Sequence, residues 1–179
     1  MPLILPYKGK SPKIHPTAKI APNATITGDV EIGANVSIWF NVVIRGDVNK
    51  IVIEDSCNIQ DGVIIHSTRG KIDTHLGPET SVGHGAILHG CITKGRSLIG
   101  MGAIILDDAI IDQHVIIGAN SLVSMSTHCE HGFIYTGTPA KMLKSIDKEK
   151  ISFYIDETTK AYIKYADGYP SFNRWKVGV

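Results

Sequence analysis

A large aliphatic residue recurs at every sixth position along most of this chain. A small or β-branched residue follows most of these four positions later, and Gly, Asn or Asp occupy many of the positions between. A period of six fits neither an α-helix nor a plain alternating strand. It is typical of short strands joined by tight bends, where each unit buries one large and one small side chain. The large positions are Ile14, Ile20, Ile26, Ile32, Ile38, Ile44, Ile53, Ile59, Ile65, Ile99, Ile105, Ile111, Ile117 and Val123, and the small ones are Ala18, Ala24, Val30, Val36, Val42, Val48, Cys57, Val63, Ala103, Ala109, Val115 and Ser121.

Three such units per coil predict a triangular solenoid of parallel strands, which is an all-β fold. Ile and Val suit this fold because their stiff, branched side chains stack rung upon rung inside the prism. A doubly wound α/β domain is the alternative for a chain with many short strands. No helical period appears before about residue 145, which disfavours it. We therefore expect a β-solenoid domain over residues 1–145.

A helical period follows the repeat. Gly137 and Pro139 mark a turn that leaves the solenoid, and Ser145 is the expected N-cap of a helix over residues 147–166. We expect this helix to lie along the outside of the solenoid, with residues 146–179 forming a helix and tail packed on it. Its apolar stripe consists of Ile151, Ile155, Tyr162 and Tyr165.

The repeat is interrupted three times, and polar residues gather at each interruption. Nine residues instead of six separate Ile44 from Ile53, and residues 67–80 cannot be fitted to the repeat and predict a protruding loop. Between Val82 and Ile99 the spacing is seventeen rather than eighteen. Because local rules tend to fail where function intrudes, these interruptions indicate the functional region.

Charge and cysteine content disfavour several classes of protein. A net charge of +1 gives no global field that would attract nucleic acid or an anionic membrane. No apolar run reaches the roughly 20 residues of a membrane-spanning helix, and the first ten residues do not make a signal peptide. The three scattered cysteines do not suggest a disulfide framework. We expect a cytoplasmic protein with neither nucleic acid nor membrane as a partner.

Three histidines, His66, His84 and His89, lie close to the interruptions. His66 and His89 each follow an inner aliphatic residue and should point outward, whereas His84 lies between two glycines. Three outward imidazoles without a thiolate at matching spacing are the ligand type of a catalytic zinc site that leaves its fourth position to water. Since six residues form one face of the prism, His84 and His89 should project from adjacent faces. If the three converge, a neighbouring subunit supplies one of them, which predicts a cyclic trimer. The spacing leaves open which one.

A competing metal-binding cluster is His128, Cys129 and His131, whose spacing is tight but whose fourth partner is not evident.

Four motifs resemble those of the γ-class carbonic anhydrases and their close homologues. They are WFNVVIRGD at 39–47, NIQDGVIIH at 58–66, VGHGAILHG at 82–90 and GTPAK at 137–141. The resemblance covers about residues 8 to 145. It implies a left-handed parallel β-helix, against the usual right-handed crossover, and a homotrimer with metal sites between subunits. The implied activity is the reversible hydration of carbon dioxide to bicarbonate.

The same resemblance assigns the metal ligands. His66 and His89 would come from one subunit and His84 from its neighbour, binding zinc or, in some members of the family, iron or cobalt.

Four further residues match family positions. Arg45 and Asp47 match a pair that makes ionic contacts across the subunit interface. Gln60 matches a residue that hydrogen-bonds the water or bicarbonate at the metal, and Tyr135 corresponds to a tyrosine that lines the pocket.

The chain departs from the family where the well-studied enzymes carry acidic proton-transfer residues. Val48 follows Asp47, and the loop after His66 holds only Asp73 and Glu79 as acids. Two alternatives therefore remain open. One is acyl transfer or thioester hydrolysis on a coenzyme A ester, with a histidine as general base. The other is a catalytically silent scaffold subunit.

Overall fold

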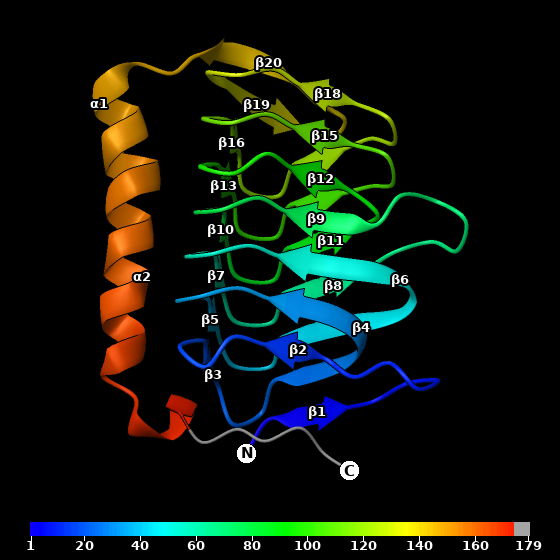
Figure 1. The fold of residues 1–179 in the computed structure, drawn as a ribbon. Helices are drawn as coiled ribbons and strands as arrows, with labels where there is room; N and C mark the ends of the chain where they lie inside the picture. Colours follow the sequence, from blue (N-terminus) through cyan, green and yellow to red (C-terminus); the bar gives the residue numbers. More distant parts are fainter. Residues whose placement is uncertain (174–179) are drawn as a thin grey trace.

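The protein is a parallel β-solenoid with a helical segment along one side (Figure 1). The computed structural model describes residues 1–173 and only the backbone of Ser152 and Asn173, so the end of the predicted tail lies outside the described residues. The expected all-β solenoid with a C-terminal helix is confirmed. No helix within residues 1–173 is long and apolar enough to cross a membrane.

Three stacks of strands form the faces of the solenoid. The first, which we call the helix face, consists of β3 (Lys19–Ile20), β5 (Ser37–Ile38), β7 (Asn58–Ile59), β10 (Ser81–Val82), β13 (Leu98–Ile99), β16 (Ile116–Ile117), β19 (Phe133–Gly137) and the antiparallel β20 (Ala140–Ser145). The second, the histidine face, consists of β1 (Leu3–Leu5), the first parts of β4 (Thr25–Ile32) and β6 (Val43–Ile53), then β8 (Ile64–His66), β11 (Ile87–His89), β14 (Ile104–Ile105) and β17 (Leu122–Val123).

The remaining stack, the third face, shares the two long strands with the histidine face. It consists of β2 (Lys13–Ile14), the second parts of β4 and β6, then β9 (Thr74–Leu76), β12 (Ile92–Thr93), β15 (Ile110–Ile111) and β18 (His128–Cys129).

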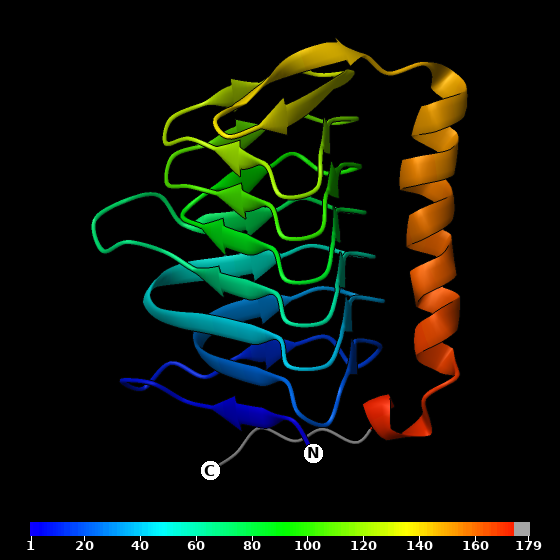
Figure 2. The same ribbon diagram turned by 180° about the vertical axis from the view of Figure 1, so that it is seen from behind.

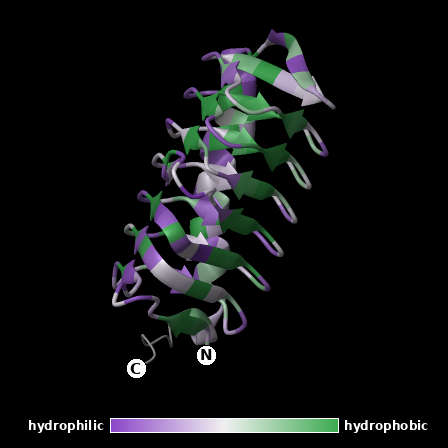
Figure 3. Ribbon diagram, turned by 90° about the vertical axis from the view of Figure 1, so that its right-hand side faces the viewer, coloured by the Kyte–Doolittle hydropathy of each residue, from purple (hydrophilic) through white to green (hydrophobic). Residues whose placement is uncertain are grey.

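The aliphatic repeat forms the core, as its period predicts. Residues of the repeat pair in register from rung to rung, and those on the helix face are fully buried from Ile20 to Ile117. The small residues four positions later are buried beside them, with one exception. Figure 3 shows the resulting apolar colour repeated on successive strands.

The exception is Val48, which the repeat placed inside and the structure leaves half-buried. The long strand β6 shifts register here, and Ile51 instead of Val48 pairs with Val30 and is fully buried. The extra residues of the first interruption therefore form the corner between two faces. The later slip is a corner shortened by one residue, where Gly90 has a positive φ of 55°.

The protruding loop is shorter than predicted. Residues 67–73 leave the solenoid on the side opposite the helices (Figures 1 and 2). Residues 74–80 rejoin it, because β9 pairs in parallel with β6 and β12 and places Leu76 and Thr80 in fully buried positions. Leu76 and Thr80 therefore occupy the large and small inner positions of a further repeat unit, which the sequence pattern did not reveal.

The helical segment comprises α1 (Lys148–Ile151), a π-helical turn (Ser152–Asp156) and α2 (Glu157–Asp167), followed by a 3-10 turn (Pro170–Asn173). The predicted cap was wrong: Ser145 ends β20, and Asp147 Oδ1 accepts the backbone N–H of Lys150 at 2.8 Å. This carboxylate satisfies a helical N–H that has no partner within the helix.

An aromatic cluster fixes the C-terminal half of the helical segment to the solenoid. Trp39 lies edge-on to Tyr162, Tyr169 and Phe172, with ring centroids 5.3–5.8 Å apart. At the π-helical turn, Arg96 Nη2 donates to Asp156 Oδ1 at 2.7 Å. The helices therefore lie over the helix face with Ile155 fully buried, whereas Tyr165 of the predicted apolar stripe is 56% exposed.

Candidate metal centre

His66 and His89 are neighbours on adjacent strands. Each is the last residue of its strand, β8 or β11, and the two pair in register. Both follow a fully buried residue, Ile65 or Leu88, so strand alternation turns their imidazoles outward as predicted. His66 Nδ1 and His89 Nε2 lie 3.3 Å apart.

A carboxylate faces the other nitrogen of each ring. His66 Nε2 lies 2.9 Å from Asp47 Oδ1, and His89 Nδ1 lies 3.0 Å from Asp107 Oδ1. A carboxylate accepts hydrogen bonds, so each neutral imidazole donates its N–H outward to Asp47 or Asp107. The two nitrogens that face each other then both carry lone pairs.

This donor set fits a metal ion. Two imidazole nitrogens bound to tetrahedral zinc at about 2.0–2.1 Å are separated by roughly 3.3–3.4 Å, close to the distance between His66 and His89. Two facing lone pairs are stabilised by a cation between them. A carboxylate behind each ligating histidine is the usual arrangement in zinc proteins, because it fixes the tautomer and raises the basicity of the ring.

Arg45 and Asp47 form an ion pair, with 2.6 Å between Arg45 Nη1 and Asp47 Oδ2. Burial alone would raise the pKa of Asp47, but the hydrogen bonds from Arg45 and His66 outweigh it and lower the pKa below its usual value. The pair that the resemblance places across a subunit interface thus also orients His66 within its own chain.

Asp107 is a site residue that the sequence reading missed. It lies in the turn after β14, and its second oxygen accepts a hydrogen bond from Thr68 Oγ1 at 3.1 Å. Its neighbour Asp108 binds Lys71 Nζ at 2.8 Å. These contacts tie the loop of residues 67–73 to the rungs beside the histidines. The only sequence signal was an acidic pair at a bend of the repeat.

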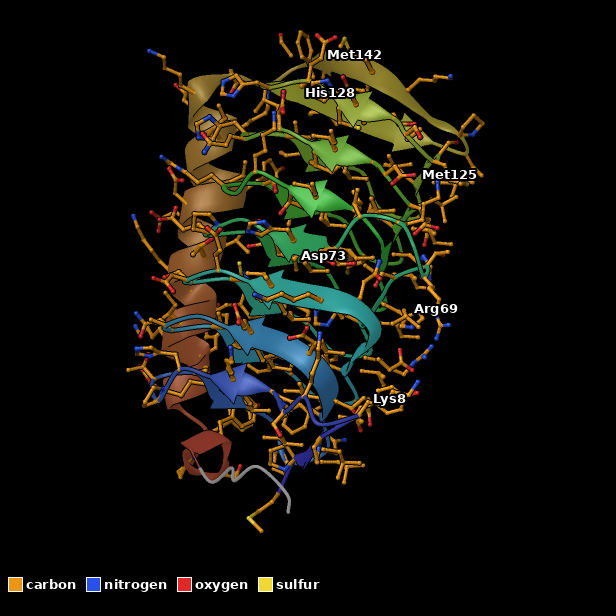
Figure 4. The ribbon with its side chains drawn as sticks, turned by 45° about the vertical axis from the view of Figure 1, so that its right-hand side comes forward. Lys8, Arg69, Asp73, Met125, His128 and Met142 are labelled. Carbon is orange, nitrogen blue, oxygen red and sulfur yellow. The ribbon has the colours of Figure 1, made fainter. Side chains whose placement is uncertain are left out.

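Asn49 also binds the loop of residues 67–73. Its side-chain amide donates to the backbone oxygen of Thr68 at 3.0 Å and to that of Lys71 at 2.8 Å. Asp73, one of the loop's two expected acids, accepts the backbone N–H of Lys50 at 3.2 Å. Figure 4 shows Arg69 at the outer part of this loop and Asp73 where the chain returns to the solenoid.

His84 lies at a different corner, in the turn between β10 and β11. Its Nδ1 lies 2.8 Å from Asp61 Oδ2. Strand β11 separates this corner from the one at which His66 and His89 lie. Within residues 1–173 no three His, Cys, Asp or Glu side chains are grouped to hold a metal. One chain therefore brings two of the three expected ligands together and directs the third elsewhere.

Gln60 lies beside His84, and both line a pocket under the helices. Gln60 is buried, and its Nε2 donates to Asn58 Oδ1 at 3.0 Å, while Asn58 Nδ2 donates to Ser81 Oγ at 2.6 Å. This chain of hydrogen bonds fixes the orientation of the Gln60 amide.

Tyr135 is not brought to this site. It occupies an inner position of β19, buried at the far end of the solenoid, and its hydroxyl accepts the backbone N–H of Glu130 at 2.9 Å. Four strand spacings separate β19 from β7, roughly 19 Å. The position suits packing, and no contact in the described residues links Tyr135 to Gln60.

The competing histidine–cysteine cluster is not assembled. Cys129 faces the core, and burial raises the pKa of its thiol to about 12. His128 points outward from the same strand to Asp112, 3.0 Å away. His131 lies against His114 instead, with ring centroids 5.0 Å apart. Adjacent residues of a strand face opposite sides, which is why close spacing did not make a site.

The chain is similar to a hexapeptide-repeat family model and to several curated proteins. Residues 11–46 match the family model for bacterial transferase hexapeptide repeats. The carnitine operon protein CaiE of Escherichia coli K12 is 37% identical over 145 residues, which cover 81% of this chain and 74% of CaiE. The chain belongs to the γ-carbonic anhydrase-like hexapeptide-repeat family. Mitochondrial γ carbonic anhydrase 2 of Arabidopsis thaliana is also 37% identical, over 140 residues that cover 75% of this chain and 50% of that protein.

This member of the family spans only about half the length of the plant γ carbonic anhydrases that it matches. Solved structures of similar length exist. A hexapeptide transferase family protein from Anaplasma phagocytophilum has a TM-score of 0.89 at 38% identity, covering 93% of this chain and 98% of its own. A candidate acetyltransferase from Bacillus cereus has a TM-score of 0.91 at 41% identity, covering 94% and 97%.

Proposed function

We propose that this protein is a γ-carbonic anhydrase-like metalloenzyme that reversibly hydrates carbon dioxide at sites between the subunits of a homotrimer. The observation that carries the proposal is the geometry of His66 and His89. Their facing nitrogens are 3.3 Å apart, and a carboxylate holds each ring from behind. Zinc is the default metal, and imidazole ligands also suit iron and cobalt.

A metal ion held by three imidazoles lowers the pKa of water to about 7 and so supplies hydroxide at neutral pH. The protein's own groups do the positioning. Asp47 and Asp107 hold the N–H protons of His66 and His89 and keep the opposite nitrogens free of protons. Gln60, oriented by Asn58, has a second N–H left to donate to an oxygen of carbon dioxide or bicarbonate, and a carbonyl oxygen left to accept from the bicarbonate hydroxyl.

Two features support the trimer. His84 lies at the corner between the helix face and the histidine face, away from the pair it would complete. Exposed apolar side chains lie on both surfaces: Ile64 on the histidine face is 43% exposed, and Met101 at the His84 corner is 57% exposed. A head-to-tail contact of this corner with a neighbour's histidine face would cover both surfaces and generate a closed ring.

Mixing two inactive variants tests the shared site. His84→Ala and His66→Ala should each abolish metal binding as homotrimers. Unfolded together and refolded at equal concentrations, they should regain about a quarter of the sites, because each site takes His84 from one chain and His66 from the next. Metal content after gel filtration measures this recovery. No recovery from trimeric mixtures would show that each site lies within one chain.

Carbon dioxide hydration itself is tested by stopped flow on protein loaded with zinc, iron or cobalt under anaerobic conditions. We expect metal-dependent turnover, slowed because Val48 follows Asp47 where the well-studied enzymes carry an acidic proton-transfer residue. Metal-loaded trimer without turnover would contradict the hydratase assignment. Hydrolysis or transfer from a coenzyme A ester would then favour the alternative suggested by the transferase relatives, and neither activity would favour a scaffold. The free, buried cysteines fit a reducing compartment such as the cytoplasm.

A further inference from the structure

An apolar pocket of about 520 Å³ lies between the helix face and the helical segment. Leu98, Ile116 and Ile134 form its floor, in register on β13, β16 and β19. Tyr154 and Thr158 line it from the helical segment, one helical turn apart. The pocket extends from Gln60 and His84 toward β20, so most of it lies away from the histidine pair.

The apolar floor is not explained by packing of the solenoid or of the helices. At the same outward positions on the lower rungs stand Ser37, Asn58 and Ser81, all buried where α2 packs on β5 and β7. On the upper rungs, Leu98 and Ile116 are only half-buried and face open volume. An apolar concave surface with a few polar groups at its ends is typical of a small-molecule site.

The charged side chains that line the pocket are two lysines. Lys144 and Lys150 are at the end near β20, and no carboxylate is among the lining residues described. Lys150 is paired with Asp147, at 2.5 Å. The Lys144 ammonium has no ion pair or hydrogen bond among residues 1–173, and the residue is exposed. An unpaired ammonium beside an aliphatic floor complements a ligand with an apolar body and an anionic end.

The helical side of the pocket has an unusual backbone. Tyr154 belongs to the π-helical turn, and π-helical turns are rare and frequent at functional sites. The ion pair between Arg96 and Asp156 holds this turn in place at the second corner of the helix face. The pocket wall is therefore anchored independently of any ligand.

We propose that this pocket binds a medium-chain fatty acid, with its alkyl chain over Leu98 and Ile116 and its carboxylate at Lys144. The pocket spans three strand spacings from β10 to β19, about 14 Å. An extended alkyl chain advances about 1.25 Å per carbon, so roughly 8–12 carbons fill this length. The end of the pocket at Gln60 and His84 adjoins the proposed metal centre, but the fatty-acid proposal does not depend on the hydratase activity.

A chain-length series tests the proposal by calorimetry on the intact protein. Across hexanoate, octanoate, decanoate, dodecanoate and tetradecanoate, the affinity should rise about fourfold per added methylene up to about 12 carbons and then stop rising. Octanamide, which lacks the charge, should bind more weakly than octanoate. Thr158→Trp, which fills the pocket from the helical side, should abolish binding, and circular dichroism verifies its fold.

Lys144→Ala should weaken octanoate binding about two- to fivefold and leave octanamide unchanged. Lys141→Ala is the matched control, because Lys141 is an exposed lysine of the same strand that does not line the pocket. Equal losses in the two variants, or affinity that is independent of chain length, would overturn the proposal. His66→Ala should bind octanoate normally, which separates this test from that of the metal centre.

Discussion

Asp107→Ala is the substitution that most directly tests how this chain prepares its metal ligands. The Asp107 carboxylate is the partner of His89 Nδ1 at 3.0 Å and of Thr68 Oγ1 at 3.1 Å. Without it, the imidazole of His89 loses the acceptor that fixes its tautomer, and the loop of residues 67–73 loses one of its attachments.

The substitution should lower both the metal affinity and the stability of the fold. Loss of a carboxylate behind a ligating histidine typically weakens metal binding 10- to 100-fold. Loss of an acceptor that leaves a buried partner unsatisfied costs about 1–3 kcal/mol; His89 is partly open to solvent, so we expect about 1 kcal/mol. Asp107→Asn keeps an oxygen acceptor without the charge and should lie between the wild type and Asp107→Ala.

Competition of the metal with a chromogenic chelator measures the affinity, and urea unfolding measures the stability. Asp108→Ala is the control, because Asp108 ties the same loop through Lys71. It should leave the metal affinity within about twofold of the wild type, since the side-chain partner of Asp108 is Lys71 and not His89. If both variants lose metal equally, the loop and not the His89 tautomer controls binding, and our reasoning fails.

Three further predictions concern the solenoid itself. Ile105→Ala should lower the free energy of unfolding by about 2–5 kcal/mol because its side chain is fully buried. Ile104→Ala, on the outward side of the same strand, should cost clearly less, and equal losses in urea would contradict the inward and outward assignment. Gly100→Ala should cost about 1–3 kcal/mol, since its new Cβ would lie 2.5 Å from the backbone nitrogen of Ala119; an unchanged thermal midpoint would refute this. Stability should also fall from about pH 9 upward, by up to about 1.4 kcal/mol per thiol per pH unit, because burial raises the thiol pKa to about 12 and only the unfolded chain releases the protons. A variant with all three cysteines replaced by alanine should show a shallower pH slope, and an equal slope would exclude the thiols Cys57, Cys91 and Cys129 as the cause.

The sequence predicted the solenoid because every strand unit must bury one large and one small side chain, and this requirement produces the six-residue repeat. An inner aliphatic such as Ile99 contacts the rungs above and below. Every rung therefore needs such a residue at the same position, and the sequence period follows directly from the stacking. The outward direction of His66 and His89 followed from the same alternation. The repeat failed at Val48, because a register shift inside one long strand changes which residue points inward, and it failed at Leu76, because a loop of unknown length hides the phase.

What the sequence alone determined about this protein is the fold class, the helix along its side, the family and the three histidines. Only the tertiary structure decided which groups surround them. Asp107 reaches His89 from a different rung, and the Tyr135 side chain is buried at the far end of the solenoid. The same holds for the pocket under the helices, whose floor and wall come from segments far apart in the chain. The physical reason is that a local repeat fixes contacts between neighbouring rungs, whereas contacts across corners and with the helices depend on how the whole chain is wound.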